Sequence, residues 1–159
     1  MTIEIERKFL LPGPPSDDRL GPGTHIRQGY LAEEDSVEVR VRITDDTSSV
    51  TVKAGSGLSR TEVDVAISAG QAEALWPHTV GRRIDKTRHR VALDGLPPDH
   101  VAEVDIYAGT LEGLCVAEVE FASEAVAASF DPPDWFGREV TGDPSWSNAT
   151  LSRHGRPDT

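Results

Sequence analysis

The stretch Ile3-Glu4-Ile5-Glu6-Arg7-Lys8-Phe9-Leu10 alternates between charged and apolar residues, and its period of two predicts a β-strand. The faces of this strand are Glu4, Glu6 and Lys8 on one side, and Ile3, Ile5 and Phe9 with the polar Arg7 on the other. Glu4 and Glu6 point the same way, so they raise each other's pKa unless a cation lies between them. The two carboxylates therefore either lie in open water or hold a metal ion.

Length and composition fit one cytoplasmic domain. The chain has 159 residues, of which 37% are hydrophobic and 27% charged, and its net charge is −11. This charge is opposite to the basic footprint of nucleic-acid-binding proteins. We find no signal peptide and no apolar run that could span a bilayer, so we expect no membrane partner. The lone Cys115 excludes a disulfide framework and a multi-thiolate zinc site, and we expect it to be a small buried residue.

The same period-two pattern recurs along the chain and predicts about eight strands joined mainly as hairpins. The expected strands cover residues 3–10, 25–31, 37–43, 49–54, 60–67, 83–93, 101–107 and 116–121. Three short helices are expected, one capped by Ser68 and ending near Pro77, one capped by Ser123 over 124–130, and one begun by Asp143-Pro144 over 145–153. Residues 96–99 are expected to form a turn. This order of elements indicates an antiparallel α+β domain over residues 1–154, with residues 155–159 as a frayed tail.

The polar faces of these strands are unusual because nearly all of them carry charges. The cations are Lys8, Arg40, Arg42, Lys53, Arg60, Lys86, Arg88 and Arg90, and the carboxylates are Glu4, Glu6, Glu62, Asp105, Glu118 and Glu120. A solvated outer face is one interpretation, since half-buried strands commonly turn a polar face to water. We favour a closed barrel with a charged interior, because clean Val and Ile faces lie opposite almost every charged one.

A charged interior indicates a ligand. Mutual salt bridges could fill the interior, but the burial of so many charges without a ligand is costly. Converging arginines suit a polyanion with several phosphates, which a guanidinium binds in a bidentate manner. Converging carboxylates suit Mg²⁺ or Mn²⁺, because these ions take oxygen ligands. The pattern therefore predicts a metal-assisted phosphate site.

The charged motifs resemble those of a known family. Glu4-x-Glu6-x-Lys8 is similar to the ExExK signature of the CYTH, or triphosphate tunnel metalloenzyme, superfamily. The motifs that follow in the family's order are Arg40-x-Arg42, Thr51-Val52-Lys53, Arg60-x-Glu62, Lys86-x-Arg88, Asp105 and Glu118-x-Glu120. The segment from Trp135 to Thr141 and the helix that contains Asn148 resemble the ending of small bacterial members. The resemblance implies a closed eight-stranded antiparallel β-barrel, or tunnel, with a charged interior and a few flanking helices.

The resemblance also implies roles for individual residues. It implies metal ligation by Glu4, Glu6, Glu118 and Glu120, with Asp105 as a further acid near the metal or the attacking water. It implies binding of the substrate's phosphates by Lys8, Arg40, Arg42, Lys53, Lys86 and Arg88, to which we add the matching pair Arg60 and Glu62. The residues expected to carry catalysis are Glu4, Glu6, Lys86, Arg88, Asp105 and Glu120. Tyr30 matches an aromatic residue that plugs one tunnel end in some small members, and ordinary core packing is its alternative.

The function that the resemblance implies is hydrolysis of inorganic triphosphate to pyrophosphate and phosphate with Mg²⁺ or Mn²⁺. The expected partner is this small-molecule substrate, and the expected assembly is a monomer or homodimer. Hydrolysis of nucleoside triphosphates and a class IV adenylate cyclase are alternatives within the superfamily, although the sequence shows no motif for an adenine pocket. A non-catalytic polyphosphate- or nucleotide-binding module is an alternative of another class, and it could dispense with the acids.

Overall fold

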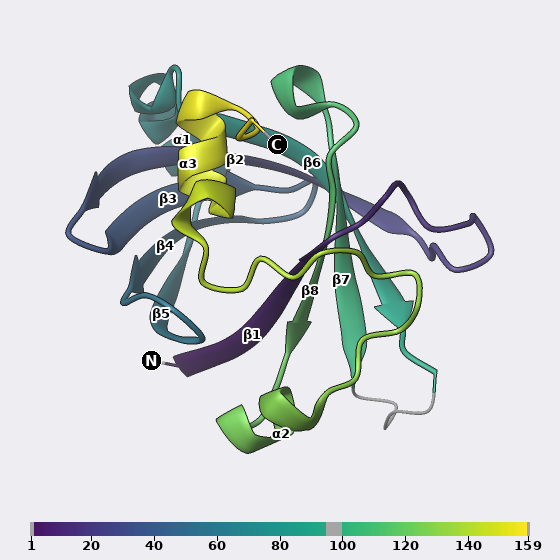
Figure 1. Ribbon diagram of the computed structural model, residues 1–159. Coiled ribbons are helices and arrows are strands. Elements are labelled where there is room, and N and C mark those ends of the chain that lie inside the picture. The colour runs from purple at the N-terminus through teal and green to yellow at the C-terminus, as the bar shows by residue number, and fades with distance from the viewer. Residues whose placement is uncertain (1, 95–99, 159) are drawn as a thin grey trace.

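The chain folds as a closed barrel of eight antiparallel strands (Figure 1). The computed structural model describes residues 2–94 and 100–158. The strands are β1 (Thr2–Leu10), β2 (Gly23–Glu34), β3 (Val37–Ile43), β4 (Ser48–Ala54), β5 (Ser59–Ile67), β6 (Arg83–Ala92), β7 (Val101–Tyr107) and β8 (Cys115–Glu120). Around the barrel their order is β1-β5-β4-β3-β2-β6-β7-β8. The predicted fold class and the predicted closure of the sheet are confirmed.

Short helices flank the barrel. The α-helices are α1 (Ala69–Leu75), α2 (Glu124–Ser129) and α3 (Asn148–His154), and 3₁₀ turns cover Trp76–Thr79, Gly109–Leu111 and Pro144–Trp146. Ser68 and Ser123 are the N-caps of α1 and α2, as predicted, since each side chain accepts a backbone N–H of the first turn. Within the described part of the chain, no helix is long and apolar enough to cross a membrane.

The predicted last helix, over 145–153, is wrong in its boundaries. Asp143 accepts the Ser145 N–H and begins the 3₁₀ turn only. Ser147 then adopts an extended conformation, and its side chain accepts the Thr150 N–H at 3.1 Å as the N-cap of α3. A second serine cap inside the segment therefore divides it into two pieces.

One further sequence prediction differs in extent from the structure, and one falls on residues that the structure does not describe. Strand β2 is longer than the expected 25–31, because Gly23 pairs with His89 of β6 and Glu34 pairs with Val37 across a tight turn. The predicted turn over 96–99 lies outside the described residues. Cys115 is buried, as expected, at 1% exposure.

Along one of its two edges, strand β1 pairs first with β5 and then with the C-terminal segment. Residues Thr2–Ile5 pair with β5, and the Glu6 N–H still donates to the Leu58 carbonyl at 3.4 Å. Two residues later the partner is the C-terminal segment, since the Val140 N–H donates to the Lys8 carbonyl at 2.8 Å. The C-terminal segment therefore replaces β5 in the barrel wall along the second half of β1.

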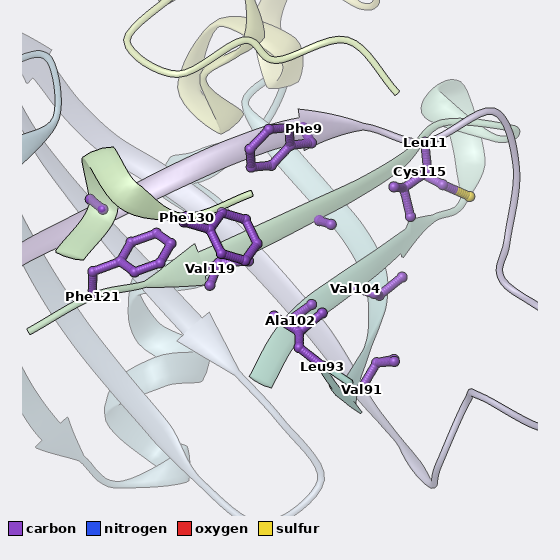
Figure 2. Packing of buried hydrophobic residues seen from close by; sticks show 12 residues of the cluster. Phe9, Leu11, Val91, Leu93, Ala102, Val104, Cys115, Val119, Phe121 and Phe130 are labelled. Atoms are coloured by element: carbon purple, nitrogen blue, oxygen red, sulfur yellow. The ribbon is translucent and has the colours of Figure 1, made fainter. Parts of the chain in front are cut away.

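The main apolar core lies outside the barrel, where β1 and β6–β8 are covered by α2 and the segment that follows it (Figure 2). Its buried members include Phe9, Phe121, Phe130, Val104 and Val119. Arg7, the polar residue on the apolar face of β1, is accommodated by specific partners. Its guanidinium donates to both Glu139 carboxylate oxygens, at 2.8 and 2.7 Å, and to two carbonyl oxygens at the end of α2. Burial of the strands' apolar faces on the outside leaves their charged faces to line the interior.

Candidate active site

A cavity of about 500 Å³ occupies the interior of the barrel. Most of the sequence-predicted site residues line it: Glu4, Glu6 and Lys8 of β1, Tyr30 of β2, Arg40 and Arg42 of β3, Lys53 of β4, Arg60 and Glu62 of β5, Arg88 of β6, and Glu118 and Glu120 of β8. The structure therefore brings together side chains that the sequence spreads over 117 positions (4 to 120). Two predicted site residues, Lys86 and Asp105, do not line the cavity and are fully buried.

Arg40 and Arg42 form the part of the cavity whose positive charge is not neutralised. Arg40 is only 6% exposed, and its buried Nε atom has no hydrogen-bond partner in the described chain. Arg42 donates to the neutral side chain of Gln28, at 3.3 Å from Nε and 3.1 Å from Nη2. Burial and the repulsion of Arg40 lower the pKa of Arg42 to about 10, so it is still charged at neutral pH. Among the described residues, no carboxylate forms an ion pair with either guanidinium.

The adjacent strands β4, β5 and β1 pair a lysine with two carboxylates. Lys53 Nζ lies 2.8 Å from Glu4 Oε2 and 2.7 Å from Glu62 Oε2. Burial raises the pKa of Glu4, and Lys53 offsets this effect only in part. Burial acts in the same direction on Glu62, but Lys53 outweighs it, so the pKa of Glu62 is lowered. Lys53 therefore interacts with two carboxylates and neutralises the charge of Glu4 only in part.

A second acidic group lies where β1 meets β8. Glu6 pairs across the strands with Glu120, which is exposed at the open end, and Lys8 pairs with Glu118. Repulsion by Glu118, followed by burial, raises the pKa of Glu6 to about 7. Burial alone would raise the pKa of Glu118, but Lys8 and Arg88 hold it well below the ordinary value. This corner of the cavity therefore contains more carboxylates than its cations neutralise.

Arg88 is held in place from behind by a buried carboxylate. Asp105 on β7 lies opposite Arg88 in the β6–β7 register and accepts its Nε and Nη2 atoms, both at 2.7 Å. Asp105 Oδ2, which accepts Arg88 Nη2, also accepts Lys86 Nζ at 2.5 Å. Burial lowers the pKa of Lys86 to about 7, whereas Lys86 and Arg88 together lower that of Asp105 despite its burial. Arg88 also contacts Glu103 and lies 3.3 Å from Glu118.

Neutral side chains close one end of the cavity. Tyr30 is 1% exposed, and its hydroxyl accepts Gln28 Nε2 at 3.0 Å. Burial raises the pKa of Tyr30 to about 12, so the hydroxyl stays protonated. The Tyr107 hydroxyl donates to Asn148 Oδ1 at 2.6 Å and connects β7 to α3, which crosses this end of the barrel (Figure 1). Tyr30 therefore both packs in the core and contributes to the wall of the cavity.

The carboxylates of the cavity suit a divalent metal ion by their chemistry. Glu4, Glu6, Glu118 and Glu120 offer only oxygen atoms, and the raised pKa of Glu6 shows repulsion that a divalent cation would relieve. In the described residues, no three acidic or imidazole side chains converge closely enough to form a ready-made metal site. Glu4 and Glu118 instead point to Lys53 and Lys8, at 2.8 and 3.5 Å. These carboxylate oxygens fit a hard divalent cation once Glu4 has separated from Lys53 and Glu118 from Lys8.

Sequence reasoning left several polar residues in or next to the cavity wall out of the site, among them Glu38, Glu103, Gln28 and Asn148. Glu38 contacts Arg60 at 2.9 Å, and Glu103 contacts Arg88. Both lie inward by alternation, which was the only signal for them. Gln28 is fully buried and shares a face with Tyr30 two residues later, a spacing that could have identified it. Asn148 gives no such signal, because only the packing of α3 brings it to the cavity.

The chain has close relatives along almost its whole length, although no protein-family model matches it. The inorganic triphosphatase of Nitrosomonas europaea is 43% identical over 150 residues, which cover 94% of this chain and 96% of that protein. The inorganic triphosphatase of Acetivibrio thermocellus is 38% identical over 156 residues, which cover 97% and 96%. A crystal structure of an inorganic triphosphatase has a TM-score of 0.71 at 40% identity and covers 99% of both chains.

Sequence identity of this extent, together with the same closed barrel, shows common descent with these proteins. The charged motifs that face the cavity agree with the resemblance noted in the sequence. The chain therefore belongs to the family of these inorganic triphosphatases, within the CYTH, or triphosphate tunnel metalloenzyme, superfamily.

Proposed function

We propose that the protein is a divalent-metal-dependent triphosphatase that hydrolyses inorganic triphosphate to pyrophosphate and orthophosphate inside the barrel. The observation that carries this proposal is the pair Arg40 and Arg42, two cations that face an enclosed cavity without a carboxylate partner among the described residues. An anionic ligand is the partner that such buried guanidinium groups lack. Both curated relatives bear the name inorganic triphosphatase, which supports the same substrate.

The cations would hold the substrate along the cavity. Guanidinium groups bind phosphate oxygens in a bidentate manner, so Arg40, Arg42 and Arg88 would fix the orientation of the phosphate chain. The proposed further phosphate ligands are Lys8, Lys53 and Arg60, each of which now contacts a carboxylate or a carbonyl oxygen. In phosphoryl transfer such positioning and neutralisation of charge supply most of the catalysis.

The carboxylates would hold the metal. Bound Mg²⁺ or Mn²⁺ would offset charge on the phosphate oxygens and lower the pKa of the attacking water. We assign its ligation to Glu4, Glu6, Glu118 and Glu120, which line the cavity from two adjacent strands. Glu62 shares Lys53 with Glu4 and would orient this lysine.

Asp105 and Lys86 would act without lining the cavity. Both are fully buried, and Asp105 accepts two hydrogen bonds from Arg88. This geometry supports a positioning role for Asp105, which fixes the plane of the Arg88 guanidinium. That Asp105 contacts the metal or water, and that Lys86 contacts phosphate, stays a prediction from the family resemblance.

The remaining parts of the proposal concern the surroundings of the enzyme. We infer one domain up to residue 154, where α3 ends, and a cytoplasmic location, for which the single free and buried Cys115 is suited. The partner is the small-molecule substrate, and the assembly is a monomer or homodimer.

A phosphate-release panel tests the proposed function. Purified protein is incubated with triphosphate, longer polyphosphate, ATP or thiamine triphosphate, each with Mg²⁺, Mn²⁺ or a chelator. The expected result is metal-dependent release of one orthophosphate per triphosphate, with slower turnover of the nucleotide. Cyclic AMP from ATP would support a cyclase, and ADP as the main product a nucleotidase. Thermal stabilisation by triphosphate without any product would contradict catalysis and support a binding module.

A further inference from the structure

The two cavity-facing arginines of β3 lie between neutral side chains on both adjacent strands. Their cross-strand partners are Tyr30 and Gln28 on β2, and Thr51 and Ser49 on β4. On the β4 side, Thr51 lies between Arg40 and Asp64 in the register and donates to the Asp64 carboxylate at 2.6 Å. The neutral side chains therefore separate the arginines from the carboxylates of the more distant strands.

The contacts of Gln28 fix the orientation of its side-chain amide. A guanidinium group can only donate hydrogen bonds, so the Gln28 atom that faces Arg42 is the oxygen. This atom, Oε1, accepts Arg42 Nε at 3.3 Å and Arg42 Nη2 at 3.1 Å. The amide nitrogen then faces the opposite way and donates to the Tyr30 hydroxyl at 3.0 Å. Because Gln28 is also fully buried, its oxygen is held toward Arg42 by both packing and hydrogen bonds.

Arg88 has the corresponding arrangement with a charged partner. Asp105 lies opposite Arg88 in the β6–β7 register, as Gln28 lies opposite Arg42 in the β2–β3 register. Both partners are fully buried, and each accepts two hydrogen bonds from the guanidinium that it faces. Asp105 adds a negative charge to its arginine, whereas Gln28 adds none. The barrel therefore orients two arginines by the same geometry but compensates the charge of only Arg88.

The neutral partner leaves the charge of Arg42 available to a ligand. Arg42 lines the cavity, whereas Gln28 does not, so a ligand can reach the guanidinium but not the amide. The contacts with Gln28 use only part of the N–H groups of Arg42, and the others can donate to phosphate oxygens. A phosphate that binds Arg42 therefore displaces no carboxylate from it.

We propose that Gln28 is a positioning residue of the triphosphate site, which orients Arg42 toward the substrate without neutralising its charge. This inference rests on the proposed function, since it takes triphosphate as the anion that Arg42 binds. Gln28 acts through Arg42 and does not contact the substrate itself. A carboxylate at position 28 would keep the orientation of the guanidinium but compensate its charge. An apolar side chain there would keep the charge but lose the orientation.

Two substitutions of similar size separate these effects, namely Gln28→Glu and Gln28→Met. Isothermal titration calorimetry with a chelator measures the dissociation constant for triphosphate, and calorimetric melting measures the stability of the ligand-free protein. We expect the dissociation constant to rise at least about tenfold in Gln28→Glu and about threefold in Gln28→Met. The melting temperature should be higher in Gln28→Glu than in Gln28→Met, because methionine leaves the Arg42 N–H groups without their acceptor.

The expected order of stability is thus opposite to the expected order of affinity. A merely structural role would make the two orders agree, since glutamate is the closer match to glutamine in shape. Ser49→Asp leaves Gln28 unchanged and adds a carboxylate on the other side of Arg42, so it should also raise the dissociation constant, by at least about fivefold. An unchanged dissociation constant in either carboxylate variant, or tighter binding by Gln28→Glu than by Gln28→Met, would overturn the inference. Binding is measured without turnover, so a wild type that binds triphosphate but releases no phosphate with any metal would refute the proposed hydrolysis and not the role of Gln28.

Discussion

At the scale of single residues, the site is defined by which charges have partners. Lys53 contacts both Glu4 and Glu62, Arg60 contacts Glu38, and Arg88 contacts Asp105. Arg40 and Arg42, in contrast, form no ion pair with a carboxylate among the described residues, and the Arg40 Nε atom has no hydrogen-bond partner there. The structure therefore distinguishes cations that pair with carboxylates of the cavity wall from cations that have no carboxylate partner among the described residues. The sequence pattern does not make this distinction.

Replacement of Arg40 by alanine should weaken triphosphate binding. A hydrogen bond to a charged group contributes about 1.5–3 kcal/mol, so the dissociation constant should rise roughly 10- to 150-fold. Isothermal titration calorimetry on Arg40→Ala and the wild type measures this change. Arg90→Ala is the matched control, because the Arg90 side chain lines the same cavity but is 68% exposed. Equal losses of affinity in the two variants would count against a special role for the buried arginine.

Replacement of Glu6 by glutamine should stabilise the metal-free protein at high pH only. The folded-state pKa of Glu6, about 7, exceeds its ordinary value of 4.5, so the folded state binds more protons between these limits. Stability from this group is therefore complete below pH 4.5 and lost as the pH rises through 7. With a chelator present, the melting temperature of Glu6→Gln should match the wild type at pH 4.5 and exceed it at pH 8. A Glu34→Gln control in the exposed turn should show no such divergence, and an equal gain at both pH values would refute the assignment.

At the scale of elements, the β6–β7 pair supports the active site through a buried ion cluster. Asp105 lies between Lys86 and Arg88 and is fully buried. Its replacement by asparagine leaves the two cations without a buried counter-charge. We expect the free energy of unfolding to fall by about 3–5 kcal/mol, measured by urea denaturation. The double variant Lys86→Met with Asp105→Leu should recover part of this loss, because paired apolar replacements avoid the unpaired buried charge. A fall of less than about 1 kcal/mol in Asp105→Asn would show that the cluster is not what holds Arg88.

The elements also show which features sequence reasoning can reach. The alternation of Val37 to Ile43 and of Val101 to Tyr107 predicts β3 and β7 with their observed bounds, because period two is a local property of the chain. The serine caps of α1 and α2 are local for the same reason. The replacement of β5 by residues near Val140 along β1 is not predictable in this way, since it depends on contacts about 130 residues apart. The sequence therefore gives no sign of this replacement.

At the scale of the whole molecule, closure of the sheet separates two environments. The acidic exterior gives the net charge of −11, whereas the interior collects most of the strand cations into one cavity. The predicted orientation of Glu4, Arg42 and Glu118 into this cavity is confirmed by its lining. The inward direction of Lys86 and Asp105 also follows from alternation, but their complete burial depends on the packing of β6 against β7. Alternation predicts the face of a residue, and only the three-dimensional packing shows whether a ligand can reach it.

A crystal structure of the protein with triphosphate and Mn²⁺ tests the central claim most directly. The expected result is triphosphate inside the barrel, with phosphate oxygens within hydrogen-bond distance of Arg40 and Arg42. An anomalous manganese signal should lie beside carboxylates of Glu4, Glu6, Glu118 or Glu120. Triphosphate on the exterior of the barrel, or an empty interior at saturating ligand, would contradict the claim that these charged faces enclose the substrate site.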